Sequence, residues 1–414
     1  MGWWDRLRGK PTRDDFATLF MGQLRARGVT DLDYDPERFM LRWGAGEGAT
    51  YLGNLYHEYL ATSRTRRQAF LERVVGVTHR TTPADRAPLS RDVVLERLLP
   101  RLRERSYYTV TIPLQASEMG EAMPARRFAH RLVAEHLALG LVQDFPEHIE
   151  EMASEQLLEL GLDLDDAYQR ATDNLESLSP LPFQPVAEGV FCSPYHDNHD
   201  ASRIALTSTI RRLPVRGLPV VMAPHRDWLI VSGTDDDAGL ASMAKLTVDL
   251  LDEPRFLSSI PVCLIDDVYA PFLPDPDSAV ASLFAELRVR QLVGEYQHQR
   301  ELLRRRHDEE IFVASFTGLS SNDGGGATSY CVWTRGVPSL LPHAEQVALL
   351  DPDGDHPEPL LAPWSVVVDH AGDLLSPEDC YPPRYRVEGF PDARAMAAIA
   401  AESTAAVSRS RGLV

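Results

Sequence analysis

The sequence is poor in cysteine and has no long hydrophobic run. Its 414 residues include four cysteines, which form no C-x-x-C pair and no spacing typical of a zinc site or a disulfide framework. No apolar run approaches the roughly 18 residues that a membrane-spanning helix needs, and the N-terminus lacks the apolar stretch of a signal peptide. We therefore expect reduced thiols, no membrane span and a cytoplasmic location.

Positive charge is also in short supply. The chain has 42 Lys and Arg residues against 61 Asp and Glu residues, which gives a formal net charge of -19 at pH 7. Because such a chain repels phosphate backbones and anionic membranes, we expect no nucleic acid as a partner. Trp3 and Trp4 lie beside three basic residues, which leaves open a peripheral membrane contact, with a packed or frayed terminus as the alternative.

Three segments begin like known site motifs, and each departs from its motif at a defining position. Residues 351–362 open like a calcium loop, but His356 stands where glycine is required and Ala362 where glutamate is required. The glycine-rich residues 322–328 lack the lysine of a phosphate-binding loop, and residues 318–322 lack the last glycine of a nucleophile elbow. The sequence therefore predicts no cofactor.

The composition is that of a folded protein, because 44% of the residues are hydrophobic and 25% are charged. At roughly 100 to 200 residues per domain, the length predicts two or three modules. We expect an α+β fold with mixed or antiparallel sheets, helices packed on one face, and a C-terminal third that is mostly antiparallel β. The expected modules are an α-β-β-α unit over residues 1–80, a central α+β unit over 90–270, and a long helix followed by antiparallel strands and a final helix over 275–414.

The spacing of apolar residues predicts individual elements within this plan. Helical spacing favours helices in each module, and runs rich in β-branched and aromatic residues favour strands. We expect a helix over 92–103, a strand over 107–112, a hairpin over 218–231, a long helix over 275–306 and a strand over 364–368.

The densest group of potential metal ligands lies just before a predicted helix. His196 and His199 are three residues apart, and Asp197 and Asp200 stand beside them. Imidazoles and carboxylates at this spacing suit a zinc or manganese site. The alternative is that Asp200 or Asn198 caps the helix that follows, with the other side chains in solvent.

Three short segments in the middle of the chain carry a resemblance to a known family. They are Asn-Leu at residues 174–175, Asp197 followed by Asp-Ala-Ser-Arg-Ile at 200–204, and Pro-His-Arg-Asp-Trp-Leu-Ile at 224–230. Over residues 163–231 the chain resembles an uncharacterised bacterial family, the domain-of-unknown-function family 1444 (YtpQ-like). The family has no established activity, so the resemblance implies a fold and no reaction. It also implies that the aspartates and the Asp-Ala-Ser-Arg run belong to the motif, whereas the two histidines do not.

Two functions are compatible with these observations. The first is a non-enzymatic protein-binding or adaptor protein with another protein as its partner, since the sequence has no nucleophile near a base and no complete metal set. Its expected binding residues are the polar ones of the two longer motif segments, namely Asp197, Asp200, Ser202, Arg203, His225 and Arg226.

The second is a metal-dependent hydrolase. In it, an ion is held by residues on one short segment, and a base comes from the turn of the predicted hairpin. The ligands would be His196, Asp197, His199 and Asp200, and the catalytic candidates are His225 and Asp227. A structural network, in which Arg203 pairs with the nearby aspartates, is a further interpretation of the same residues.

Overall fold

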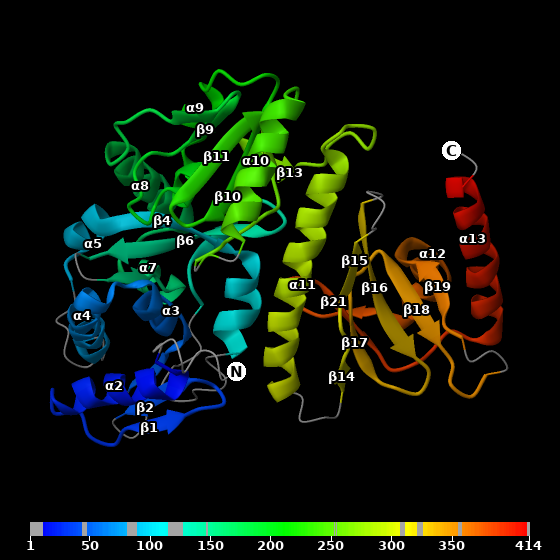
Figure 1. The fold of residues 1–414 in the computed structure, drawn as a ribbon, viewed down its shortest axis with the longest axis horizontal. Coiled ribbons are helices and arrows are strands. Elements are labelled where there is room, and N and C mark those ends of the chain that lie inside the picture. The colour runs from blue at the N-terminus through cyan, green and yellow to red at the C-terminus, as the bar shows by residue number, and fades with distance from the viewer. Residues whose placement is uncertain are drawn as a thin grey trace.

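The fold is α+β, as the sequence predicts, with helices beside several antiparallel and mixed sheets (Figure 1). No helix in the part of the chain that the structure describes is long and apolar enough to cross a membrane. Trp3, Trp4 and His356 lie outside the described residues. The computed structural model describes residues 11–43, 48–80, 89–114, 127–145, 148–251, 253, 255–306, 311–320, 326–354 and 358–411.

The N-terminal unit packs three helices against a small antiparallel sheet of order β1-β2-β3. Its first helix starts with a capping box, in which Thr12 and Asp15 each accept a hydrogen bond from the other's backbone N–H. The unit has one more strand and one more helix than the predicted α-β-β-α order. Its elements are α2 (Arg13–Arg25), β1 (Asp33–Asp35), β2 (Met40–Trp43), β3 (Gly48–Tyr51), α3 (Gly53–Ala61) and α4 (Arg67–Arg80).

The central region contains two sheets. The smaller has the order β4-β6-β5, with β7 also paired to β6, and the larger is fully antiparallel with the order β13-β12-β10-β11-β9-β8. The small sheet and its helices comprise α5 (Arg91–Arg97), β4 (Leu98–Glu104), β5 (His130–Leu132), β6 (Leu137–Asp144), β7 (Ile149–Glu151), α7 (Ser154–Glu159) and α8 (Leu164–Ser177).

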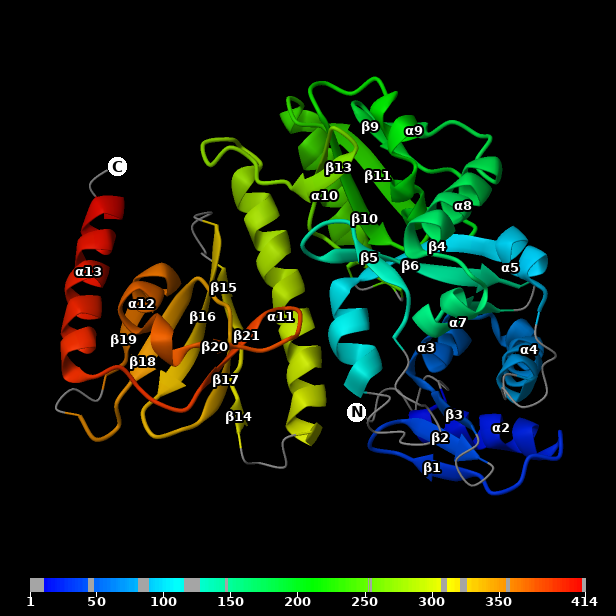
Figure 2. The same cartoon turned by 180° about the vertical axis from the view of Figure 1, so that it is seen from behind.

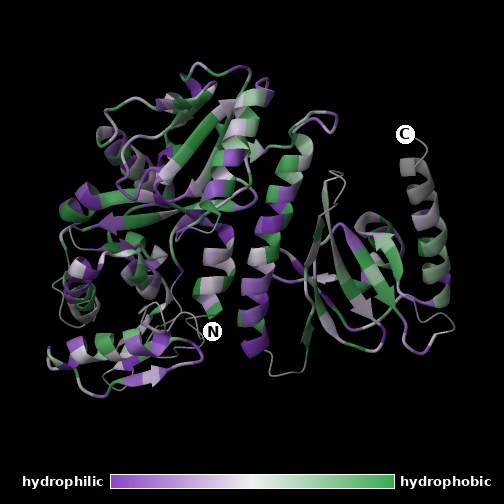
Figure 3. Ribbon diagram, viewed as in Figure 1, coloured by the Kyte–Doolittle hydropathy of each residue, from purple (hydrophilic) through white to green (hydrophobic). Residues whose placement is uncertain are grey.

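The larger sheet contains the hairpin that the sequence predicts, closed by the pairing of His225 with Trp228. Strands β10 and β11 are mostly hydrophobic (Figure 3) because both of their faces are covered. The elements of this part are β8 (Gln184–Ala187), β9 (Val190–Cys192), η6 (Ala201–Ala205), α9 (Thr207–Arg211), β10 (Pro219–His225), β11 (Trp228–Gly233), α10 (Asp237–Leu250), β12 (Val262–Ile265) and β13 (Val268–Pro271).

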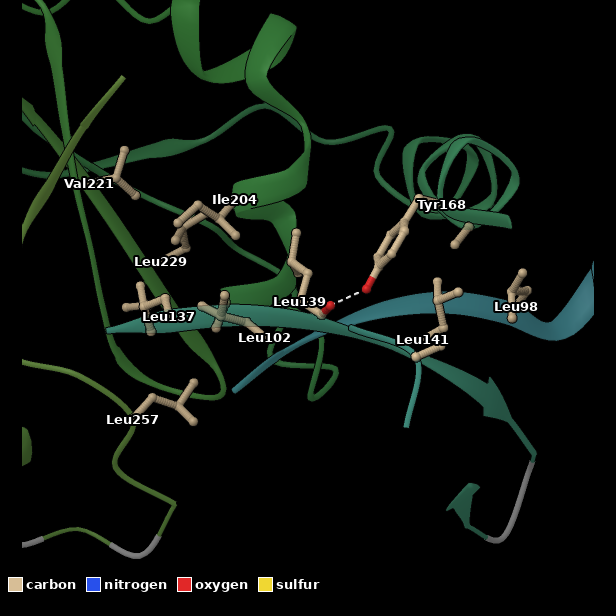
Figure 4. Packing of buried hydrophobic residues seen from close by; sticks show 14 of the residues in the cluster. Leu98, Leu102, Leu137, Leu139, Leu141, Tyr168, Ile204, Val221, Leu229 and Leu257 are labelled. Carbon is tan, nitrogen blue, oxygen red and sulfur yellow. Dashed lines mark hydrogen bonds between the residues drawn. The ribbon is translucent and has the colours of Figure 1, made fainter. Parts of the chain in front are cut away.

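One hydrophobic core joins the two central sheets. Figure 4 shows leucines of β4 and β6, such as Leu102 and Leu139, facing Ile204 of η6 and Leu229 of β11. The hydroxyl of Tyr168 on α8 donates a hydrogen bond to the carbonyl of Leu139, so the one polar atom of this ring is satisfied inside the core. The core therefore positions η6, which follows the motif predicted to form the site.

The C-terminal region is built on the long helix α11 (Ala281–Arg306), which runs between the central sheets and the C-terminal sheets (Figure 2). Phe284 and Leu287 pack against the six-stranded sheet, and Tyr296 packs in the C-terminal core. The two C-terminal sheets have the orders β14-β17-β21-β20 and β15-β16-β18-β19. Most of their pairs are antiparallel, as predicted, and the parallel pairs are β14 with β17 and β16 with β18.

The remaining elements complete these sheets and cover one side of them. Two helices follow the strands in the chain, and Figure 1 shows the last of them at the edge of the molecule. The elements are β14 (Phe312–Val313), β15 (Thr317–Ser320), β16 (Ala327–Thr334), β17 (Ser339–Pro342), β18 (Gln346–Leu350), β19 (Leu360–Pro363), α12 (Trp364–Ala371), β20 (Ser376–Pro377), β21 (Arg384–Val387) and α13 (Ala393–Arg411).

Two predicted strands are helical instead. The segment predicted as a strand over 107–112 is the π-helix η4 (Tyr107–Thr111), in which Tyr108 packs over β6 while Val110 packs against α11 and β17. The segment over 364–368 forms the start of α12. Its buried residues are Trp364, Val367 and Ala371, which share one face of a helix. In both cases the surrounding structure, and not the local run of β-forming residues, decides the conformation.

Candidate functional site

Asp200 organises the loop that leads into η6. Its side chain is fully buried, and both of its carboxylate oxygens accept hydrogen bonds. Oδ1 accepts from the hydroxyl of Ser193 at 2.6 Å and from the backbone N–H of Tyr195 at 3.0 Å. Oδ2 accepts from the backbone N–H of Asp197 at 3.1 Å. Asp200 thus folds the loop back on itself. It stands at the N-cap of η6, but its side chain makes no capping hydrogen bond there, so the predicted helix cap by Asp200 is wrong.

Arg203 and Asp197 form a two-pronged ion pair beside this loop. The Nη1 and Nη2 atoms of Arg203 donate to the two oxygens of Asp197 at 2.9 and 2.7 Å, and its Nε donates to Ser179 at 2.8 Å. The guanidinium also lies 3.7 Å from the ring centre of Tyr195. Burial opposes ionisation of Asp197, but the hydrogen bonds from Arg203 and from the backbone N–H of His199 lower its pKa. The Nε, Nη1 and Nη2 atoms of the buried guanidinium thus each have an acceptor.

The turn of the β10–β11 hairpin lies against the same loop. The backbone N–H of Asn198 donates to Asp227 at 2.8 Å, and the N–H of Ala201 donates to the carbonyl of Arg226 at 3.0 Å. His225 accepts a hydrogen bond at Nδ1 from the backbone N–H of Asp227 at 3.1 Å. The structure therefore brings the two motif segments together, with their polar groups bonded to each other and to the backbone.

The four ligands of the hydrolase alternative do not converge on one point. His196 is exposed, has a left-handed backbone with φ of 52°, and lies 6.2 Å from the ring centre of Trp228. His199 is buried and faces Asp144 at 3.5 Å, and the two aspartates bind the arginine and the loop backbone as described above. Within the described ranges, no group of three His, Cys, Asp or Glu side chains is placed to hold a metal ion.

A second polar group, which the sequence did not suggest, lies on one face of β4. Arg101 and Arg103 share this face, and the residue paired with Arg101 across the sheet is Gly140. A Cβ atom at Gly140 would collide with the hydroxyl of Tyr108, which donates to Glu151 at 3.3 Å. Arg103 lies 3.7 Å from the other oxygen of Glu151. Small residues in β6 thus make room for a layer of arginine, tyrosine and glutamate side chains.

Ser202 joins this layer to the motif loop, since its hydroxyl accepts a hydrogen bond from the backbone N–H of Leu102 at 3.1 Å. The hairpin turn brings Arg226 to the same place. Burial and the charges of Arg101 and Arg103 lower the pKa of Arg226 to about 9. Burial and the charge of Arg103 lower the pKa of Arg101 to about 10. The three guanidinium groups therefore lie close enough to repel one another.

Glu295 of α11 lies near this layer, and its shifted pKa predicts that the free energy of unfolding depends on pH. Burial and the neighbouring carboxylate of Glu104 raise its pKa from 4.5 to about 7, in spite of a hydrogen bond with Ser106. Because the folded pKa is raised, the folded state holds a proton that the unfolded state releases between pH 4.5 and 7, so stability falls as the pH rises through this window.

We expect Glu295→Gln to increase the free energy of unfolding at pH 8 by up to about 3 kcal/mol, and to leave it nearly unchanged at pH 4. Urea unfolding at the two pH values measures this difference. Glu301→Gln, at an exposed position of the same helix, is the control and should have little effect at either pH. An equal effect of Glu295→Gln at both pH values would contradict the assignment.

Comparison with protein-family models gives no match, and comparisons with curated proteins and with solved structures give none either. The resemblance to family 1444 therefore stays a prediction from the motif segments. The chemistry of the site has to be argued from its own geometry.

Proposed function

We propose that the protein is a non-enzymatic protein-binding protein, and that its partner docks on the outer face of the sheet β15-β16-β18-β19. The proposal rests on a set of exposed apolar side chains on a sheet face that carries no charged residue. Leu319 is 51% exposed, Val332 37% and Leu361 52%. Exposed apolar patches with a polar rim mark protein interaction sites.

The strand register puts these residues on the same face. Leu319 of β15 pairs with Thr328 of β16, Val332 of β16 pairs with Ala348 of β18, and Ala348 pairs with Leu361 of β19. Side chains that pair directly across strands point to the same side of a sheet. The face carries no charged residue, and its members are Thr317, Leu319, Thr328, Tyr330, Val332, Thr334, Gln346, Ala348, Leu350, Leu361 and Pro363.

The helices of the region cover the opposite face. Cys331 and Trp333 alternate with the exposed residues of β16 and are fully buried in the core formed with α11, α12 and α13. A Cβ atom at Gly318 would meet Val289 and Val293 of α11, so this helix also lies on the buried side. Figure 1 shows α11 and α13 at opposite ends of the C-terminal region, with the strands between them. The uncharged face is thus left without a helix in the described part of the chain.

Charges at the ends of the strands indicate the character of the partner. Glu345 precedes β18, Asp351 and Asp353 follow it, and Glu358 precedes β19. Among the described residues, Arg335 is the arginine paired with this group, through Asp351 at 2.7 Å. An apolar face with an acidic rim fits a protein whose own apolar patch is bordered by basic residues. A second copy of this chain, with its net charge of -19, would be repelled.

The polar motif around Asp200 supports a binding role in an indirect way. Its donors and acceptors are bonded within the motif, so we expect it to shape the central region and not to react with a substrate. The cytoplasmic location also stays a prediction.

We expect Leu361→Asp to abolish capture of the partner while the protein stays folded, because a charge on this apolar face must be desolvated on docking. Affinity capture from a cell lysate, compared by quantitative mass spectrometry, measures the effect, and circular dichroism checks the fold. Leu158→Asp is the matched control, since this leucine is 76% exposed on α7, far from the sheet in sequence.

Proteins captured equally by the wild type and Leu158→Asp, and lost with Leu361→Asp, would support the proposal. The same set of proteins captured by all three forms would show that the sheet face does not bind. A folded protein that captures nothing above background in any form would also count against a protein-binding function.

A further inference from the structure

Two of the three arginines on β4 and in the hairpin turn lack the acidic partners that buried arginines need. Arg101 is 7% exposed, and its Nε and that of Arg103 are buried with no hydrogen-bond acceptor in the described part of the chain. Arg103 has Glu151 at 3.7 Å, while Arg101 and Arg226 have no carboxylate within ion-pairing distance in that part. A buried guanidinium without an acceptor loses its hydration and gains nothing in return.

From this geometry we propose that Arg101, Arg103 and Arg226 form a binding site for a small phosphate-bearing anion. The site goes beyond the proposed protein-binding face and lies in a different region of the fold. Its ligand would supply the negative charge and the hydrogen-bond acceptors that the three arginines lack. Guanidinium groups suit phosphate because each can donate two parallel hydrogen bonds to its oxygens.

The neighbouring backbone contacts fix the positions of these arginines without using their side chains. Leu102, between Arg101 and Arg103, is bonded to Ser202 at 3.1 Å, and Ala201 is bonded to the carbonyl of Arg226 at 3.0 Å. Two adjacent residues of η6 thus bring the hairpin turn to the edge of β4. The site is held by rigid elements, as preorganised binding requires.

Two acidic groups lie near the site. Glu104 feels the positive charges of Arg103, Arg226 and Arg101, while burial raises its pKa. Glu151 shares its charge between Arg103 and the hydroxyl of Tyr108. In the described part of the chain, neither Glu104 nor Glu151 lies within ion-pairing distance of Arg101 or Arg226, so the site still lacks a direct counterion for two of its three guanidinium groups.

The experiment titrates the full-length protein with inorganic phosphate. Isothermal titration calorimetry measures the affinity and thermal unfolding measures Tm, with sodium chloride at matched ionic strength as the reference. We expect saturable binding and a rise in Tm for the wild type. Arg101→Met should weaken the affinity at least about tenfold, because one charge-assisted bond set is lost. Arg212→Gln, an exposed arginine outside the site, makes the same change in net charge and should bind like the wild type.

Without phosphate, Arg101→Met should have a Tm equal to or above that of the wild type, since an unpaired buried charge has been removed. A large drop in its Tm would overturn the proposal and show that Arg101 is structural. A phosphate effect that does not saturate, or is the same in Arg101→Met, would also overturn it, because it would be a general salt effect. If Arg101→Met does not fold, Arg226→Met at the half-buried turn provides the same comparison.

Discussion

Replacing Arg384 with alanine is expected to lower the free energy of unfolding by about 3 to 5 kcal/mol. Arg384 begins β21, is fully buried, and has no carboxylate within ion-pairing distance in the part of the chain that the structure describes. Its charge is solvated by neutral acceptors instead. Nε donates to Gln299 at 2.5 Å, Nη1 to the carbonyls of Ala314 and Leu340 at 2.8 and 2.9 Å, and Nη2 to the carbonyl of Tyr296 at 3.3 Å.

These acceptors come from α11, the segment after β14, and β17, so one side chain ties the long helix to a C-terminal sheet. Alanine would leave a cavity and several unpaired buried carbonyl oxygens. Arg384→Lys keeps the charge but cannot reach all the acceptors, and we expect an intermediate loss.

Urea unfolding followed by tryptophan fluorescence measures these losses. The matched control is Arg386→Ala, two residues along the same strand, where the arginine pairs with Glu378 at 2.9 Å and both side chains are about one-third exposed. A surface pair of this kind is worth less than about 1 kcal/mol. Equal losses for the two alanine variants would show that the buried Arg384 contributes no more to the free energy of unfolding than the surface Arg386.

The sequence predicts the fold class and the hairpin well because both depend on strong local patterns. Strands β10 and β11 are short apolar runs around a proline-led turn, and that pattern has few alternatives. The helix predicted over 92–103 is wrong in its second half, where β4 begins at Leu98. Pro100 lies inside that range and was the available signal, since proline is tolerated in an edge strand such as β4 but not within a helix.

The candidate site also has parts that the sequence predicts and parts that it does not. The hydrolase interpretation requires the two motif segments to lie together, and the structure joins them through Asn198 and Asp227 although their potential ligands do not converge. The arginine layer was missed because its recognition requires β4 to be a strand. Once it is one, Arg101 and Arg103 alternate with Pro100 and Leu102, and their shared face is evident from the sequence. The contribution of Arg226 depends on tertiary contacts that no local pattern contains.

Loss of Asp200 tests whether the motif is architectural. We expect Asp200→Ala to lower the free energy of unfolding by about 3 kcal/mol, because three donors lose their acceptor at once inside the protein. Asp200→Asn keeps the volume but has a single acceptor oxygen, so its amide nitrogen would face a donor and we expect about 2 kcal/mol of loss. A role in filling space alone would make the asparagine variant neutral.

Asp227→Ala is the control within the same network, since Asp227 is half-buried and accepts a single hydrogen bond from the loop backbone, at 2.8 Å from Asn198. We expect it to cost about 1 kcal/mol. Hydrogen exchange of the N–H groups of Tyr195 and Asp197 provides a second measurement, because an architectural aspartate protects these two amides and its loss should speed their exchange. If both amides keep their protection in Asp200→Ala and the stability is unchanged, Asp200 does not hold the loop, and its burial would need a different explanation.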